Sequence, residues 1–504
     1  MFSIRAGLNA SIGLPKHAVI LVGQNKLLKN VQFNGDLEDK FNGEIIIIAD
    51  EKKWNAAVKA LPASGSIPLV FNQSKIISVP DTASRHNTPS NCHLIAKELK
   101  VFPITKDTQN LNIILYSDAE NVLANVCAIA RSFPVFTRKT ESAYTANINV
   151  EVCLSDDSEV HEDDIKFLNV VSQSIRHACR LIDSPANEMT TDALVQEALA
   201  IAEDLGVKKL VISGEDLDRD GFGGIYSVGK AGPTPPAFVV LSHTPSSAKE
   251  TYCLVGKGVV FDTGGMQIKS KTGMPNMKRD MGGAAGLLGA FRTLVSVGFE
   301  QNLHLCLCIV ENNISPLANK PDDVIKMLSG KTVEINNTDA EGRLILADGV
   351  YYAKNVLKAD VIIDMATLTG AQAHLSGKLH SALLTNSEEW EQMACDAGRR
   401  SGDLVAPMVF CPDLHFSDLK SPIADMRNSN LGKMEGPPSA VAGLFIGAHI
   451  NFGEGLKWLH FDIAAPAESG DRATGYGPAL LSYLLGHHTD VPMLKKMNKN
   501  CPEC

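Results

Sequence analysis

The sequence predicts an α/β protein: an N-terminal α/β domain, a connecting helix, and a larger C-terminal α/β domain with a mostly parallel central sheet. Three observations support this prediction. The chain has 504 residues, which is enough for more than one domain. It is 44% hydrophobic and 21% charged, as is typical of globular proteins. Apolar runs of strand length alternate with stretches of helix length, a pattern that favours parallel sheets covered by helices.

The N-terminal domain is predicted at residues 1–164. It contains strand-like runs such as 18–22 and 112–115, and a helical stretch near 119–131. No dense cluster of the residue types that carry catalysis appears in this part of the sequence. We therefore expect the chemistry of the protein to lie elsewhere in the chain.

A connecting helix is predicted at residues 165–185. The segment before it, 156–164, has six carboxylates in nine residues, and carboxylates favour the N-terminus of a following helix. We interpret that segment as a solvated linker, with a calcium site as the alternative. Apolar residues from Ile165 to Ile175 then recur at helical spacing, and Pro185 ends the helix.

The C-terminal domain is predicted at residues 186–504, where strands and helices alternate more regularly. The predicted strands are 209–212, 237–241, 252–255, 303–310, 361–363 and 458–463, and the predicted helices are 191–204, 283–297, 344–357 and 439–450. In sheets of this kind, ligands bind beyond the carboxyl ends of the strands. The loops that follow these strands are therefore the candidate site.

Charge and composition narrow the range of partners. The net charge is -10, from 47 basic and 57 acidic residues, which argues against nucleic acid as the main partner. No secretory signal is visible, and no run approaches the ~18 apolar residues that span a bilayer. We expect a cytoplasmic protein without a membrane partner.

The eleven cysteines are scattered and do not resemble a disulfide framework. Most of them lie in apolar runs, where a cysteine is a small core residue. Cys501 and Cys504 have CxxC spacing at the end of the chain. We interpret this pair as part of a reduced, disordered tail, and a zinc or redox pair is the weaker alternative because no second pair is present.

Three loops of the C-terminal part, at residues 256–269, 277–285 and 337–343, concentrate polar side chains. Their carboxylates are Asp262, Asp280, Asp339 and Glu341. Four carboxylates gathered at strand ends cannot remain charged and unpaired, because burying isolated charges is very costly. Two divalent cations would balance them, which predicts a dinuclear site. The alternative is a set of separate surface carboxylates.

The segment Asn337–Leu344, with the sequence NTDAEGRL, resembles without substitution the signature octapeptide of the leucyl aminopeptidase family of metallopeptidases. Other segments resemble the same family in the same order, namely 257–269, 277–285, 366–371, 424–428 and 458–464. The resemblance covers about residues 180–490. The larger domain is thus expected to be the catalytic domain, whereas the first domain shows no signature.

The resemblance implies a role for each matching position. The metal ligands would be Lys257, Asp262, Asp280, Asp339 and Glu341, with Asp262 and Glu341 bridging two ions. The catalytic pair would be Lys269 and Arg343. The substrate would be bound by Lys269, Asp280, Asp339, Met277, Thr367, Leu368 and Gly370. Zn or Mn is expected, with Mg or Co as alternatives, because oxygen ligands dominate the set.

The same resemblance implies a mechanism. A water activated by two metal ions would attack the peptide carbonyl, and Lys269 would stabilise the charge that develops on oxygen. Arg343 would hold a bicarbonate that accepts and returns protons. Neighbouring dications would lower the pKa of Lys257 and allow a neutral amine to bind metal. The expected substrates are peptides with a free N-terminus and a leucine-like or other neutral first residue, and the expected assembly is a homohexamer.

Other functions are less well supported by the sequence. A two-metal phosphoester hydrolase disagrees with the complete octapeptide. A DNA-binding or scaffold protein on the same fold disagrees with the net charge of -10 and with the presence of all seven predicted ligand and catalytic residues. Residues 224–231 nearly spell a phosphate-binding loop, but prolines follow instead of a helix, so we predict a structural loop there.

Overall fold

The computed structural model describes residues 1–8, 17–33, 35–41, 51–70, 73–104, 108–140, 146–433 and 435–497. The tail with Cys501 and Cys504 lies outside these ranges. The nine cysteines within them are all free thiols, in agreement with the predicted lack of a disulfide framework. Over the same ranges, no helix combines the length and the apolar character that crossing a membrane requires.

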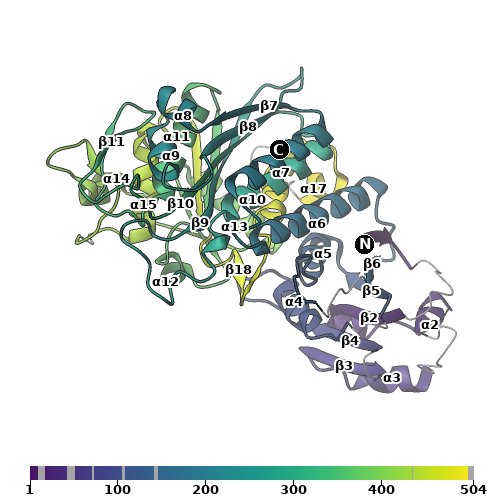
Figure 1. The fold of residues 1–504 in the computed structure, drawn as a ribbon. Coiled ribbons are helices and arrows are strands. Elements are labelled where there is room, and N and C mark those ends of the chain that lie inside the picture. Colours follow the sequence, from purple (N-terminus) through teal and green to yellow (C-terminus); the bar gives the residue numbers. More distant parts are fainter. Residues whose placement is uncertain are drawn as a thin grey trace.

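The first sheet has six strands in the order β1-β6-β5-β2-β4-β3, and only the β3–β4 pair is antiparallel (Figure 1). Its strands are β1 Phe2–Ala6, β2 His17–Gln24, β3 Gly65–Val70, β4 Ser74–Val79, β5 Asn110–Ser117 and β6 Asn147–Leu154. The helices of this part are α1 Asn25–Leu28, α2 Gly35–Phe41, α3 Glu51–Lys59, α4 Cys92–Lys100 and α5 Val122–Ala130, which follows the 3₁₀ turn η1 Ala119–Asn121. Side chains alternate along β2, so that Ile20 and Val22 share a core with α4 and α5, whereas Leu21 shares one with α3.

Helix α6, Glu162–Asp183, lies between the two sheets (Figure 1). It begins three residues before the predicted start, so the last acidic residues of segment 156–164 form its first turn. The His161 ring accepts a hydrogen bond from the Asp163 backbone N–H at 3.2 Å and caps the helix. Asp164 is buried and accepts from the backbone N–H of Met493 at 2.7 Å, which accounts for one of the six carboxylates without a calcium ion. The domain division at this helix stays a prediction.

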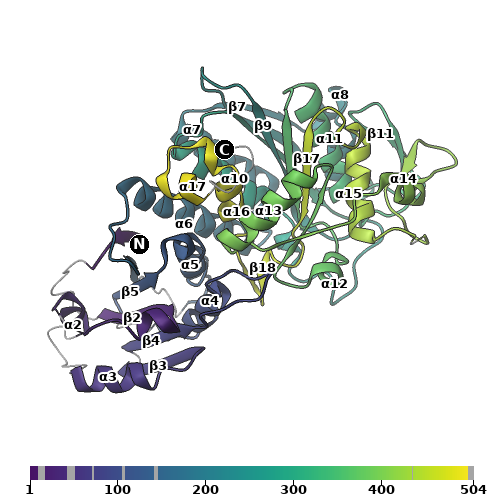
Figure 2. The same ribbon diagram turned by 180° about the vertical axis from the view of Figure 1, so that it is seen from behind.

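The second sheet has eight strands in the order β15-β14-β17-β13-β9-β10-β8-β7, and the central run from β17 to β10 is parallel (Figure 2). Its strands are β7 Lys208–Ser213, β8 Ala237–His243, β9 Thr251–Asp262, β10 Asn302–Asn312, β13 Val361–Ala366, β14 Ser381–Thr385, β15 Val405–Pro407 and β17 Lys457–Asp462. Its covering helices include α7 Thr191–Leu205, α10 Gly282–Ser296, α11 Gly342–Asn355, α13 Glu388–Ser401, α15 Pro438–Ala448 and α16 Pro478–Leu484. Helices α7, α10 and α16 share one core with α6, and helices α11 and α15 belong to the core on the other face.

Smaller elements fill the connections. They are α8 Glu215–Arg219, α9 Gly223–Gly229, η2 Met277–Arg279, β11 Val324–Lys326, β12 Thr332–Glu334, α12 Gln372–Ser376, α14 Pro412–His415, η3 Phe416–Leu419, β16 Met426–Arg427, η4 Asn451–Gly453, β18 Glu468–Ser469, β19 Arg472–Ala473, η5 Gly486–His488 and α17 Pro492–Met497. The prediction of a loop at residues 224–231 was wrong, because helix α9 occupies most of this segment. A Cβ on Gly223 or Gly224 would overlap the carbonyl oxygens of Lys326 and Leu344, so these glycines allow close helix packing.

An ionic cluster joins α6 to α7. Glu197 contacts the His177 ring at 2.9 Å and accepts from Arg180 at 2.6 Å. The hydrogen bond from His177, followed by that from Arg180, lowers the pKa of Glu197 from 4.5 to about 2. Because the pKa is depressed in the folded state, this cluster stabilises the fold above pH 4.5 and loses that contribution as the pH falls towards 2.

Substitution Glu197→Gln is therefore expected to lower the free energy of unfolding by about 1 kcal/mol at pH 7. The penalty should shrink as the pH falls below 4.5, because the carboxyl group of the unfolded wild-type chain takes up a proton there while the folded one is still charged. Urea unfolding of both proteins at pH 7, 5 and 4 measures this. A penalty of constant size at all three pH values would contradict the role of the Glu197 charge.

Candidate metal centre and substrate cavity

Strand β9 supplies Lys257 and ends at Asp262, in the middle of the second sheet. Lys257 is 2% exposed, and its ammonium group donates to Asp280 at 2.7 Å and to the carbonyl oxygen of Thr367 at 2.9 Å. It also lies 3.0 Å from a Glu341 oxygen. The cost of burying the Lys257 charge in a central strand is thus offset by two carboxylates, Asp280 and Glu341, which come from two other loops.

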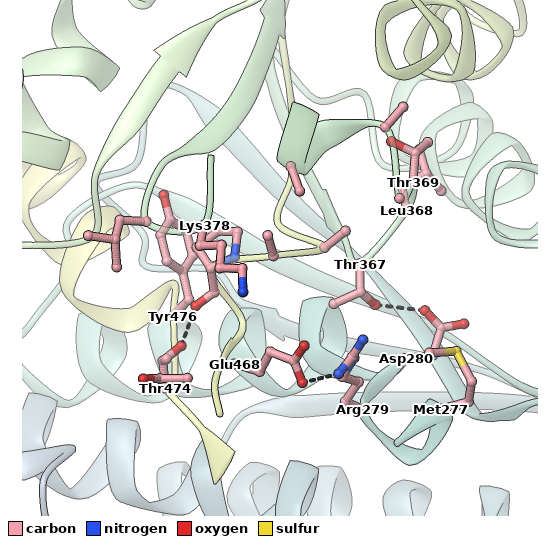
Figure 3. A pocket seen from close by; sticks show the side chains of 18 of the residues that line it. Met277, Arg279, Asp280, Thr367, Leu368, Thr369, Lys378, Glu468, Thr474 and Tyr476 are labelled. Carbon is pink, nitrogen blue, oxygen red and sulfur yellow. Dashed lines mark hydrogen bonds and ion pairs between the residues drawn. The ribbon is translucent and has the colours of Figure 1, made fainter. Parts of the chain in front are cut away.

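The second loop places Asp280 directly after the 3₁₀ turn η2 and before helix α10. One oxygen of Asp280 accepts a hydrogen bond from Lys257 at 2.7 Å. The same oxygen accepts from the Thr367 hydroxyl at 2.8 Å (Figure 3). Its neighbour Lys278 donates to the carbonyl oxygen of Asp183 at 2.5 Å, which ties the loop to the end of α6. Asp280 is therefore positioned by its own hydrogen bonds to Lys257 and Thr367, and its loop is positioned by the contact of Lys278 with α6.

The octapeptide follows β12 and its last three residues begin helix α11, so Asp339 and Glu341 converge in the turn before the helix rather than along a helix face. Lys269 crosses from the first loop and lies 2.8 Å from Asp262 and 2.5 Å from Asp339. A Cβ on Gly342 would lie 2.5 Å from Cε of Lys257, so only glycine leaves room for the lysine here.

Mutual repulsion and burial perturb the carboxyl groups. Burial, followed by the charge of Glu341, raises the pKa of Asp262 to about 6. Burial also raises the pKa of Asp280 and of Asp339. At Glu341 burial acts in the same direction, but the charges of Lys257 and Lys269 outweigh it and the pKa is lowered. Such crowded carboxylates require compensating positive charge.

The two lysines provide part of that charge. Burial lowers the pKa of Lys257, but Asp280 and Glu341 outweigh burial and raise it above its ordinary value. Asp262 and Glu341 do the same for Lys269. Without bound cations both amines are therefore ammonium groups, and the predicted depression of the Lys257 pKa applies only when dications are bound.

The residues fit a site for divalent cations. Oxygens of Asp262, Asp280 and Glu341 lie within 4.8 Å of one another. The second oxygens of Asp280 and Glu341 are buried and, among the residues described, have no hydrogen-bond partner. Unpaired buried carboxylate oxygens are costly unless an ion binds them. Carboxylates with one amine form a hard, oxygen-rich donor set that suits Zn, Mn or Mg.

Arg343 is buried at the start of α11 and donates to the carbonyl oxygen of Asn428 at 3.0 Å. Its Nε has no partner within the described part of the chain. Burial lowers the pKa of Arg343 to about 10, and the nearby Glu341 and Asp462 charges offset only part of this effect. A guanidinium with an unused buried donor is suited to bind a small anion.

All the predicted site residues line one cavity of about 1120 Å³. They are Lys257, Asp262, Lys269, Met277, Asp280, Asp339, Glu341, Arg343, Thr367, Leu368 and Gly370. Met277, Asp280, Thr367 and Leu368 lie towards one side of the cavity in Figure 3, and Lys378 and Tyr476 lie towards the other. The structure thus brings together every position that the sequence predicted.

The residues that hold this site were not predicted individually. Asp462 accepts hydrogen bonds from Leu368, from Thr369 and from the Ser439 hydroxyl, so it fixes the loop after β13. Asn312 donates to Asp262 at 2.8 Å. Asp462 lies within a segment that resembles the family, which is a usable signal, whereas Asn312 had no signal beyond its place at the end of a strand.

Comparisons with known proteins identify the family. The catalytic-domain profile of the cytosol aminopeptidase family matches residues 176–482, and the profile described as M17 aminopeptidase N-terminal domain 2 matches residues 17–142. Leucine aminopeptidase 1 of Caenorhabditis elegans is 60% identical over 496 residues, which cover 98% of this chain and 99% of that relative.

Solved structures show the same relationship. A leucine aminopeptidase structure from C. elegans superposes with a TM-score of 0.94 at 59% identity, covering 98% of this chain and 99% of that one. Leucyl aminopeptidase of Leishmania major, solved in complex with actinonin, has a TM-score of 0.86 at 30% identity and covers 96% and 94% of the two chains. The predicted α/β fold and family are confirmed. The chain belongs to the cytosol aminopeptidase family of metal-dependent peptidases and is an enzyme of the leucyl aminopeptidase type.

Proposed function

We propose that the enzyme releases leucine-like and other neutral residues from the N-terminus of peptides with a free α-amine. The observation that carries this proposal is the convergence of carboxylates and cations in one cavity. Two divalent cations, Zn or Mn with Mg or Co as alternatives, would be held by Lys257, Asp262, Asp280, Asp339 and Glu341. Bound there, they supply Lewis acidity that polarises a carbonyl and makes water nucleophilic at neutral pH.

Lys269 is the proposed donor to the oxygen that gains charge in the reaction. Its raised pKa keeps it an ammonium group at neutral pH. An ammonium group has three protons, and two of them are directed at Asp262 and Asp339. The third can be donated to a substrate oxygen in the cavity, where low solvent exposure strengthens the interaction.

Arg343 is proposed to hold a bicarbonate ion. Its unused buried Nε–H and its position on the cavity wall support this role. Bicarbonate at that position would take a proton from the attacking water and return it to the departing amine. Arg343 itself stays charged throughout, since even its lowered pKa of about 10 lies above neutral pH.

Recognition of the N-terminus is proposed to depend on Asp280 and its neighbours. The buried second oxygen of Asp280 lacks a described partner and would accept from the α-ammonium or amine of the substrate. Met277 and Leu368 would contact the first side chain, which favours apolar residues. Asp339, Thr367 and Gly370 would complete the substrate site.

The family resemblance also supports a homohexamer, and the word cytosol in the family name supports a cytoplasmic location. Peptides are the proposed partners. Neither nucleic acid nor membrane is part of the proposal. Light scattering of the purified enzyme, with a mass equal to that of six chains as the expected result, tests the assembly.

A panel of aminoacyl p-nitroanilides tests the activity. Hydrolysis of the leucine substrate should be lost after chelation and restored by at least one of Zn, Mn, Mg or Co. The matched N-acetyl-leucine substrate should be cleaved at least ~100-fold more slowly, because acetylation removes the charged amine and blocks its contact with Asp280. Inactivity with every metal would overturn the proposed function, and equal rates on both substrates would overturn the role of the α-amine.

A further inference from the structure

The substrate cavity extends well beyond the candidate metal centre. Its volume of about 1120 Å³ exceeds the ~300–1,000 Å³ of typical small-molecule sites, so it has room for several residues of a peptide. Part of its wall comes from helix α4 of the first sheet and from the segment after α12. Helix α4 lies close to β18 in both views of the fold (Figures 1 and 2). These parts of the wall have no role in the proposed chemistry.

The segment after α12 contacts the loop that precedes α4. The His380 ring nitrogen lies 2.9 Å from the carbonyl oxygen of His86, so the segment after α12 packs against the loop before α4. Arg131, which follows α5, forms a buried ion pair of 2.9 Å with Asp403. The wall is therefore fixed to the catalytic half of the chain by polar contacts.

Three lysines of this wall form a group that we call the cationic wall: Lys97, Lys100 and Lys378. All three line the cavity, and none forms an ion pair with a residue that the structure describes. The described carboxylates of the cavity are the four of the metal centre and Glu468, which is already paired with Arg279 (Figure 3). Within the described part of the chain, the cationic wall therefore has excess positive charge and no acidic partner.

The surroundings of Lys100 strengthen this picture. Burial, followed by the charge of Arg131, lowers the pKa of Lys100. Arg131 is itself paired with Asp403 at 2.9 Å. An anion beside this ammonium group would offset the repulsion from Arg131, so binding a carboxylate here is favourable.

We propose that the cationic wall binds a carboxylate of the peptide substrate, and this inference rests on the proposed aminopeptidase function. The substrate amine is held at Asp280, while Lys378 lies on the other side of the cavity with the Arg279–Glu468 pair between them in Figure 3. The chain that follows the first residue must extend away from Asp280. In a short peptide its end is a free α-carboxylate, and in a longer one an acidic side chain offers the same group.

Leucyl peptides of increasing length test the proposal. Leu-Gly, Leu-Gly-Gly and Leu-Gly-Gly-Gly are compared as free acids and as C-terminal amides. At the length that reaches the wall, the acid should have a KM about threefold to tenfold lower than the amide, with similar kcat, because the contact is made equally in the ground and transition states. The acid-to-amide ratio of KM should rise towards one in high salt, because the lysines are solvent-accessible and their charges are screened.

The triple variant K97Q/K100Q/K378Q should bring the acid-to-amide ratio of KM close to one. Because KM of the acid is divided by KM of the amide, any effect of the substitutions that is common to both peptides cancels. Lys59→Gln, on α3 and outside the cavity, is the matched control and should keep the wild-type ratio. An amide peptide with Asp in place of the last Gly distinguishes the sources: a lower KM than the Gly amide adds acidic side chains to the ligands, and an equal KM restricts them to the C-terminal carboxylate.

Two outcomes would overturn the cationic wall: equal KM values for acid and amide at every length, or an acid preference that survives the triple variant. Both are distinct from failure of the proposed function. Leucine p-nitroanilide has no carboxylate, so its hydrolysis reports the metal centre alone. If that substrate is cleaved while the acid and amide peptides behave alike, only the inference about Lys97, Lys100 and Lys378 is lost.

Discussion

Substitution Lys269→Ala is expected to lower kcat by about 100-fold to 1,000-fold, which is the usual effect of removing a donor to a developing oxyanion. The ammonium group contacts Asp262 and Asp339 and is held charged by its acidic neighbours. The five proposed ligands remain in the variant, so its content of divalent metal should stay at the wild-type level. Steady-state kinetics and metal analysis of the same preparation measure both quantities.

The neighbouring Lys271 provides the control. It is exposed, does not line the cavity and carries the same charge, so Lys271→Ala should keep wild-type kcat. A Lys269→Ala enzyme as fast as wild type would remove Lys269 from the mechanism. A slow enzyme that had also lost its metal would instead assign Lys269 to holding Asp262 and Asp339 in place.

Substitution Gly283→Ala is expected to have the largest effect on stability, about 3 kcal/mol, at the upper end for an overpacked core. A Cβ at this position would overlap the Met365 carbonyl oxygen and lie 2.7 Å from its carbonyl carbon. Both atoms belong to the backbone of β13 in the middle of the second sheet, so neither can move without disturbing the strand. The midpoint of urea unfolding should fall.

The adjacent Gly282 is the matched control, because it lies in the same first turn of α10. Its Cβ would meet the methyl group of Thr367 at 3.2 Å and the Cβ of Ala467 at 3.6 Å, contacts that small side-chain shifts can accommodate. Gly282→Ala should therefore cost much less stability than Gly283→Ala. Equal midpoints for the two variants would show that α10 is not held as closely against β13 as the structure describes.

Periodicity predicted six of the eight strands of the second sheet, missed β14 and β15, and placed some strand ends too early. The strand predicted at 252–255 runs to Asp262, because Lys257 interrupts the apolar pattern although it is buried. Burial of that lysine depends on Asp280 and Glu341, which are distant in sequence. Helix α9 was not predicted because its glycines are typical of a loop. Their presence in a helix is explained by close packing against the backbone of Lys326 and Leu344, which are distant in sequence.

The sequence predicted which residues meet in the cavity through the octapeptide and the segments that accompany it. The sequence did not predict a role for helix α4, because Lys97 and Lys100 have the pattern of the solvent-exposed face of an ordinary amphipathic helix. Their place in the cavity depends on contacts between residues far apart in the chain, such as Arg131 with Asp403. Local pattern contains no information on such pairs, because neither residue constrains the sequence around the other.

The position of α4 has a consequence for how such an enzyme diversifies. The groups proposed to break the bond lie on β9 and the loops around the second sheet, whereas Lys97 and Lys100 lie on a separate helix. Substitutions on that helix can alter which peptides are accepted and leave the reaction itself unchanged. Grafting residues 92–100 from one relative to another is then a direct route to exchanging substrate range between two enzymes that share the same chemistry.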